Sequence, residues 1–143
     1  MMSPAELGLT PQQFQNFQLL EQFLRQPLDD KVQFNMDSWC TDQKGHDYWL
    51  SDAIPECGTI RCALGCGLLA GVPCGTASTW RDYCTAKFCP FEGDIYEWVF
   101  CSNWRQTDNT PLGAADRIHQ LLESGCPPLD EIRKAQGRPD YIW

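Results

Sequence analysis

The sequence predicts a mainly α-helical protein folded as a single compact domain. Three observations support this prediction. The length of 143 residues suits one domain, two segments repeat apolar residues at helical spacing, and a third segment is apolar on all sides. With 43% hydrophobic and 12% aromatic residues, the chain has enough apolar surface for a packed core. We assign residues 1–143 to one domain, with terminal tails at 1–9 and 137–143 and long loops between the helices.

The first element is a helix predicted over about residues 11–25. Thr10 offers a side-chain oxygen that can cap its start, and Pro11 suits the first helical position. Pro27 ends the helix, because the residue before a proline disfavours helical backbone. Between these limits, apolar residues recur on one helical face. They are Phe14, Phe17, Leu20 and Leu24.

A short extended segment is expected after this helix. Val32, Phe34 and Met36 alternate with polar residues, which is the period of a half-buried strand. A segment of five residues suits a strand or a loop, so the prediction allows for one short strand or hairpin in the fold. Residues 41–56 are expected to form a long loop, and long loops often carry function.

The central element is predicted to be a buried helix over about residues 59–70. Thr59 suits the cap at its start, Gly71 can adopt the left-handed conformation at its end, and Pro73 prevents its continuation. Arg61 is the only charged residue between these limits, and a helix that is apolar on all sides is a buried one. We therefore expect the N-terminal and late helices to pack around it.

The C-terminal half is predicted to contain a long helix and shorter ones. Asn109 or Thr110 can cap a helix over about residues 111–124, with Pro111 at its first position. Residues 94–100 suit a short helix or a strand, and residues 129–135 suit one more short helix. The apolar stripe of the long helix consists of Leu112, Ala115, Ile118 and Leu122.

The charge of the chain argues against direct binding to nucleic acid. Nineteen Asp and Glu against eleven Lys and Arg give a formal net charge of −8, so the average field repels phosphate. The acidic residues suit either a solvated surface or a patch for a basic protein partner. Several of them flank Trp39 in the sequence. These are Asp29, Asp30 and Asp37 before it and Asp42, Asp47 and Asp52 after it.

Localisation is expected to be cytoplasmic. No apolar run approaches the length of about 20 residues that spans a bilayer. The N-terminal residues also lack the charged and apolar regions of a secretory signal. We therefore expect no membrane association.

The nine cysteines are interpreted mainly as small buried hydrophobic residues. An odd number cannot pair completely within one chain, and thiols stay free in a reducing cytoplasm. The alternative is a zinc-stabilised binding module, in which Cys62 and Cys66 share one helical face and Cys57 lies nearby. Such a site needs a fourth ligand, and the chain has no Cys-x-x-Cys pair. The prediction is no cofactor, with zinc as the alternative.

Cys57 is also a candidate nucleophile. The predicted helix places it within one turn of a helix N-terminus, where backbone N–H groups stabilise a thiolate and can receive an oxyanion. A cysteine-dependent hydrolase or transferase also needs a histidine base. His46 and His119 are the two histidines of the chain, and His46 lies in the polar loop. A Cys57–His46 pair is therefore the enzymatic alternative, against a buried structural cysteine.

Aromatic residues are numerous for a domain of this size and supply candidate binding residues. Most of them are expected to anchor the core. Trp104 and Arg105 form a pair of the residue types that dominate protein–protein interfaces. The candidate binding residues are Trp39, Thr59, Trp104 and Arg105.

The chain contains a pattern that resembles a group of small uncharacterised proteins encoded by phages and bacteria. The pattern consists of Trp39, the segment Cys57-Gly58-Thr59-x-x-Cys62-x-x-Gly65, a Trp- and Phe-rich segment, and Pro-x-x-Ala-Ala-x-Arg-Ile at residues 111–118. The resemblance covers about residues 34–124 and implies no activity. It implies a cytoplasmic setting, the host cytoplasm for a phage-encoded protein. Relatives often carry a histidine or an aromatic residue at the position of Cys66, which argues against a metal site there.

These observations together predict a small acidic interaction protein. In this interpretation it is a phage or mobile-element accessory or counter-defence factor that binds a host protein. The cysteine-dependent enzyme and the zinc-stabilised module are the alternatives.

Overall fold

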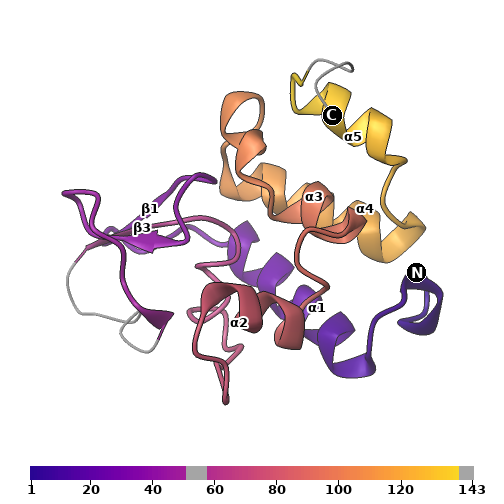
Figure 1. Ribbon diagram of the computed structural model, residues 1–143, viewed down its shortest axis with the longest axis horizontal. Coiled ribbons are helices and arrows are strands. Elements are labelled where there is room, and N and C mark those ends of the chain that lie inside the picture. The colour runs from indigo at the N-terminus through magenta and orange to yellow at the C-terminus, as the bar shows by residue number, and fades with distance from the viewer. Residues whose placement is uncertain (51–57, 139–143) are drawn as a thin grey trace.

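The computed structural model describes residues 1–50 and 58–138 and shows a mainly helical protein with a small sheet (Figure 1). The mainly helical class is therefore confirmed. In chain order the elements are η1 (Ala5–Leu7), α1 (Pro11–Arg25), β1 (Val32–Phe34), β2 (Cys40–Thr41), β3 (Thr59–Arg61), α2 (Trp80–Lys87), α3 (Asp94–Val99), η3 (Ser102–Gln106), α4 (Pro111–Ser124) and α5 (Leu129–Ala135).

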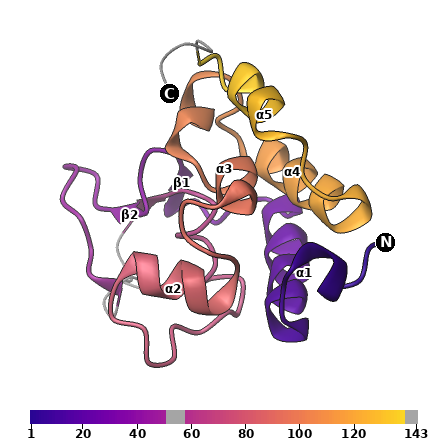
Figure 2. The ribbon, with the colours of Figure 1, turned by 45° about the vertical axis from the view of Figure 1, so that its right-hand side comes forward.

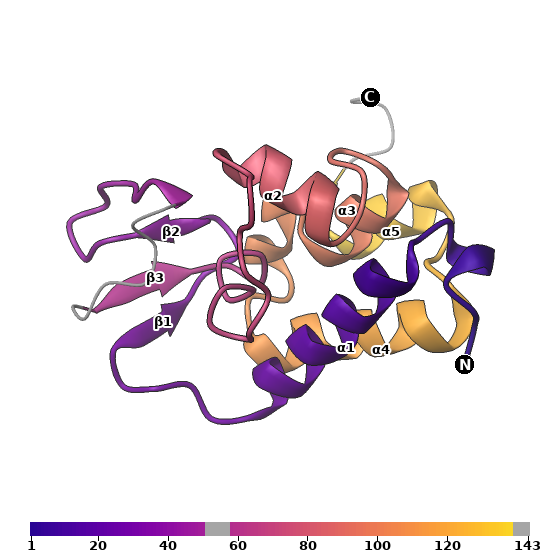
Figure 3. The same cartoon turned by 90° about the horizontal axis from the view of Figure 1, so that it is seen from below.

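Helices α1 and α4 pack side by side and have the predicted bounds (Figure 3). The Thr10 hydroxyl accepts a hydrogen bond from the Gln13 amide at 3.1 Å, and the Gln13 side chain accepts one from the Thr10 amide at 3.0 Å. This reciprocal cap satisfies two amides that the start of a helix leaves without partners. In α4, the Thr110 hydroxyl accepts from the Gly113 amide at 3.0 Å.

The prediction of a central buried helix over residues 59–70 is wrong. Thr59–Arg61 form the strand β3, and residues 63–71 form a succession of turns. β-Branched Thr59 and Ile60 favour extended backbone, and each glycine within the segment costs a helix about 1 kcal/mol. The segment is nevertheless buried, so its apolar composition indicated burial but not secondary structure. The buried residues include Cys62, Ala63, Leu64 and Cys66.

Strand β3 is the middle strand of a three-stranded sheet in the order β1-β3-β2. It pairs in parallel with β1 and antiparallel with β2. Strand β1 agrees with the extended segment expected after α1. The sheet lies at one end of the molecule, and α5 lies at the other (Figure 3). The pairing of β2 with β3 brings Trp39, one residue before β2, next to the buried turns.

Helix α2 lies in a part of the chain for which the sequence carries no clear helical period. It begins at a Thr79 cap, whose hydroxyl accepts from the Asp82 amide at 3.1 Å. Helices α3 and α5 agree with the shorter helices expected in the C-terminal half. Among the helices of the described residues, none is long and apolar enough to cross a membrane.

The N-terminal residues are attached to the end of α4, although residues 1–9 were expected to be a tail. The Met2 amide donates to the Leu122 carbonyl at 2.8 Å, and the terminal ammonium lies 3.3 Å from the Glu123 carboxylate. Figure 2 shows the N-terminus beside the C-terminal end of α4.

Aromatic rings connect the core to the surface near the sheet. Phe17 of α1 contacts Phe88 with ring centroids 5.2 Å apart, and Phe88 contacts Tyr83 of α2 at 5.8 Å. Tyr83 contacts Trp80 at 5.9 Å, and Trp80 contacts Trp39 at 6.4 Å. The Trp39 side chain therefore packs on a series of ring contacts that extends to Phe17 in the core.

Candidate functional site

A cleft of about 260 Å³ opens beside Trp39, between the sheet region and α3. We call it the Trp39 cleft. It combines aromatic rings, carboxylates and hydroxyls, and no Lys, Arg or His of the described residues lines it. The lining residues are Met36, Asp37, Ser38, Trp39, Asp47, Tyr96, Phe100 and Ser102.

The residues of the cysteine–glycine pattern hold the backbone of Trp39 in place. The Cys62 amide donates to the Ser38 carbonyl at 2.5 Å, and Gly65 approaches the Trp39 carbonyl so closely that a Cβ would overlap it. The buried Arg61 guanidinium donates to the Gly65 carbonyl at 2.9 Å. The residues of the pattern therefore form the tight turn that packs against the backbone of Trp39.

Trp39 is 40% exposed and belongs to an aromatic cluster. Its ring centroid lies 6.3 Å from that of Phe91, and Phe91 lies 4.6 Å from Tyr96. The guanidinium carbon of Arg81 lies 4.7 Å from the Phe91 centroid. The cluster leaves part of the Trp39 side chain open to solvent.

The two carboxylates of the cleft differ in their partners. Asp37 Oδ2 accepts a hydrogen bond from Arg105 Nη1 at 2.9 Å, in an ion pair that is largely exposed. The exposed Asp47 carboxylate makes no hydrogen bond and no ion pair with any described residue. The cleft thus presents one paired and one unpaired negative charge.

Of the four predicted binding residues, two lie at the cleft and two are buried. Trp39 lines it and Arg105 reaches it through Asp37. Thr59 is 2% exposed, and its hydroxyl accepts from Arg61 Nε at 3.0 Å. Trp104 is 3% exposed, and its indole N–H donates to the Glu97 carbonyl at 3.0 Å. Both buried side chains are engaged within the protein.

Sequence reasoning missed Asp37, Asp47 and Tyr96 as site residues. The concentration of aspartates around Trp39 was the available signal for the first two. No sequence signal indicated Tyr96, because it belongs to α3 and lines the cleft with Trp39 only as a result of tertiary packing.

The enzymatic alternative is not tested by this structure. Cys57 lies outside the described residues, so its distance to His46 is not defined. His46 is largely exposed, and its Nδ1 lies 3.3 Å from Asp42 Oδ2. Hydrogen bonds from the backbone amides of His46 and Lys44 lower the pKa of Asp42. The Cys57–His46 pair stays a prediction.

The zinc alternative likewise stays a prediction, because Cys57 is one of its ligands. Cys62 and Cys66 are both buried, and burial raises the pKa of Cys62 to about 12 and that of Cys66 further. Within residues 1–50 and 58–138, no three His, Cys, Asp or Glu side chains gather as metal ligands. Six of the eight described cysteines are buried free thiols, in agreement with their interpretation as core residues.

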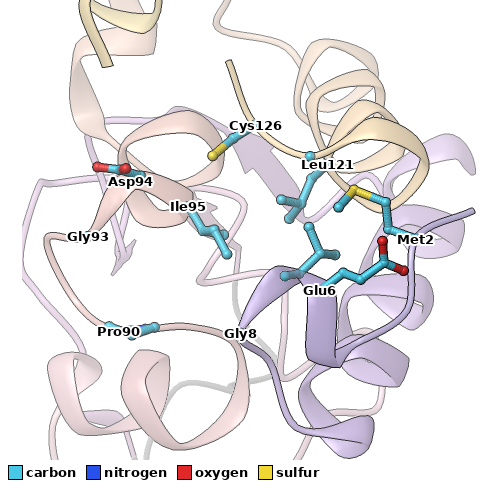
Figure 4. Close-up of a pocket in the computed structure, with 11 residues that line it drawn as sticks. Met2, Glu6, Gly8, Pro90, Gly93, Asp94, Ile95, Leu121 and Cys126 are labelled. Atoms are coloured by element: carbon cyan, nitrogen blue, oxygen red, sulfur yellow. The ribbon is translucent and has the colours of Figure 1, made fainter. Parts of the chain in front are cut away.

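A second hollow, of about 400 Å³, lies between the N-terminal segment, the start of α3 and the end of α4. Ile95 and Leu121 face each other across it (Figure 4). Its walls are mainly apolar, and the Glu6 carboxylate already accepts from the Ser3 amide at 3.0 Å. The Trp39 cleft, with its exposed ring and unpaired carboxylate, is therefore the stronger candidate site.

Comparison with protein-family models, with curated proteins and with solved structures finds no significant match to this chain. The resemblance to small phage and bacterial proteins rests on the residues of the pattern alone.

Proposed function

We propose that this protein is a small acidic interaction protein that binds a basic segment of a protein partner at the Trp39 cleft. The observation that carries the proposal is a cleft lined by both the exposed Trp39 and Asp47, whose carboxylate pairs with no other residue that the structure describes. Tryptophan is enriched among the residues that contribute most to protein–protein binding. A carboxylate beside it selects a partner of positive charge.

A second exposed tryptophan lies in the chain segment that follows Asp47. Trp49 is 75% exposed and lies two residues after Asp47. The Trp80 indole N–H donates to the Tyr48 carbonyl at 3.4 Å, which holds this loop against a ring that also contacts Trp39. Trp49 is therefore a second candidate anchor for a protein partner, since tryptophan is enriched among the residues that contribute most to protein–protein binding.

The protein carries a net charge of −8, so its average electrostatic field attracts a basic partner. Such a charge raises the rate at which a positive segment encounters the cleft, and salt screens this attraction. In the setting implied by the resemblance, the partner is a host protein and this protein is a phage or mobile-element accessory or counter-defence factor.

The test is the affinity of the full chain for a short lysine- and arginine-containing peptide, measured by titration calorimetry. We expect binding that weakens as salt rises, and a loss of about tenfold, or 1.4 kcal/mol, for Trp39→Ala and for Asp47→Asn. Asp130→Asn on α5 is the matched control, since it removes one exposed charge at the end of the molecule away from the sheet (Figure 1). Equal affinities for Asp47→Asn and Asp130→Asn would contradict the proposal.

A further inference from the structure

The Trp39 cleft has the size of a site for one side chain. Its volume of about 260 Å³ lies below the range of about 300–1,000 Å³ that is typical of small-molecule sites. A helix or strand of a partner does not fit inside it, whereas one long side chain does. The chemistry of the walls then decides which side chain it recognises.

Flat aromatic rings and carboxylates form those walls. Trp39 and Tyr96 supply rings, and Asp37 and Asp47 supply carboxylates. A guanidinium is planar and weakly hydrated, so it can stack on a ring and hydrogen-bond a carboxylate at the same time. A lysine ammonium is a compact and strongly hydrated point charge. The combination of ring and carboxylate therefore favours arginine over lysine.

One guanidinium group of this protein already lies between an aromatic ring and a carboxylate. The guanidinium carbon of Arg117 lies 4.4 Å from the Trp104 ring centroid, and Arg117 Nη1 donates to Asp108 Oδ2 at 2.8 Å. A tryptophan ring and an aspartate thus bind the same guanidinium. The Trp39 cleft offers the same pair of groups at the surface, in Trp39 and Asp47.

A second guanidinium stacks on the aromatic cluster beside the cleft. Arg81 lies over Phe91, and the Phe91 ring contacts both Trp39 and Tyr96. Arg105 pairs with Asp37, so the carboxylate open to an incoming cation is that of Asp47.

We infer that the Trp39 cleft binds the guanidinium of a single arginine side chain from the partner. The guanidinium stacks on Trp39 and hydrogen-bonds the Asp47 carboxylate. This inference rests on the proposed function, because it identifies the residue of the basic segment that enters the cleft.

The test compares three peptides that share a lysine-rich background and differ at one central position, which is arginine, lysine or the neutral isostere citrulline. Their affinities for the full-length protein are measured by titration calorimetry. We expect the arginine peptide to bind about tenfold more tightly than the lysine peptide, and the citrulline peptide to bind no better than the lysine peptide. Asp47→Asn should remove the preference for arginine, whereas Trp39→Phe, which keeps an aromatic ring, and Asp130→Asn should retain it.

The outcomes separate this inference from the function on which it rests. Equal affinities for the arginine and lysine peptides, with Trp39→Ala weakening both, would overturn the arginine site and leave the interaction function standing. A citrulline peptide that binds as tightly as the arginine peptide would also overturn it, since the positive charge would then be irrelevant. Failure of all three peptides to bind would overturn the proposed function together with the inference.

Discussion

Gly65 lies against the backbone of Trp39, and a Cβ at this glycine would overlap the Trp39 carbonyl oxygen. The neighbour is backbone, so no side-chain rotation can relieve the overlap. The buried turn after β3 and the exposed tryptophan of the cleft therefore depend on each other. This contact gives the glycine of the cysteine–glycine pattern a structural role in the candidate site.

We predict that Gly65→Ala destabilises the protein by about 3 kcal/mol or more, because overpacking against fixed backbone forces the chain to move. The free energy of unfolding in urea measures this loss. Gly93→Ala is the control, because its Cβ would lie 3.4 Å from the Pro90 carbonyl, an ordinary contact. That variant should lose less than about 1 kcal/mol. A Gly65→Ala protein as stable as the Gly93→Ala protein would contradict the packing described here.

The pair of Asp108 and Arg117 leads to a second stability prediction. Arg117 is buried against Trp104, and burial lowers its pKa to about 10. Asp108→Asn leaves this guanidinium without its countercharge, which we expect to cost about 2 kcal/mol, since the Asp108 side chain is itself partly exposed. The measurement is again urea unfolding.

A matched control for this prediction is Asp37→Asn, which removes the carboxylate of an ion pair at the surface. Asp37 pairs with Arg105 at 2.9 Å, but both side chains are exposed to solvent. Surface ion pairs contribute about 0–1 kcal/mol, so this variant should be close to the parent protein in stability. Equal losses for the two variants would show that the burial of Arg117 does not matter.

The sequence predicted those elements whose signals are local. Helices α1 and α4 each begin with a threonine cap and a proline and continue with an apolar period. Strand β3 could not be recognised in this way, because its stability comes from pairing with Val32–Phe34, far away in the sequence. A segment of only apolar residues is compatible with a buried strand followed by turns as well as with a buried helix.

The site was predictable to a similar extent. The exposure of Trp39 agrees with its role as a candidate binding residue, and the aspartates around it indicated a charged neighbourhood. The burial of Thr59 and Trp104 depends on two arginines, Arg61 and Arg117, whose positions only the tertiary structure defines. Composition alone cannot separate an exposed tryptophan from one beneath a buried guanidinium.

Thiol reactivity supplies a third prediction. Burial raises the pKa of Cys62 to about 12, so at about pH 8 only about one Cys62 in ten thousand is a thiolate. Iodoacetamide should therefore label the half-buried Cys74 well before Cys62 in the folded protein. Peptide mapping by mass spectrometry gives both rates, and urea should make them similar. Equal rates without urea would contradict the burial of Cys62.

The same labelling experiment tests the enzymatic alternative. A cysteine nucleophile has a lowered pKa and reacts with alkylating agents near neutral pH. Labelling of Cys57 faster than that of Cys74 near neutral pH would favour a cysteine-dependent enzyme. Labelling of Cys57 at the rate of an ordinary thiol would count against it.

The last prediction concerns Arg105, which sequence reasoning proposed as a contact residue. In the structure its guanidinium pairs with Asp37 at the edge of the cleft. If the cleft binds a cation, Arg105 competes for the Asp37 carboxylate and repels the incoming charge. Arg105→Gln should then strengthen binding of a basic peptide by about threefold, which corresponds to the modest energy of an exposed ion pair.

Titration calorimetry with the same basic peptide decides between these two roles of Arg105. The unfolding free energy should change by less than about 1 kcal/mol, because the ion pair is exposed, so a change in affinity cannot be attributed to loss of the fold. Asp37→Asn serves as the companion variant and should weaken binding, since it removes the carboxylate that Arg105→Gln releases. Weaker binding by Arg105→Gln would instead make Arg105 a contact to the partner, as Arg is at many interfaces.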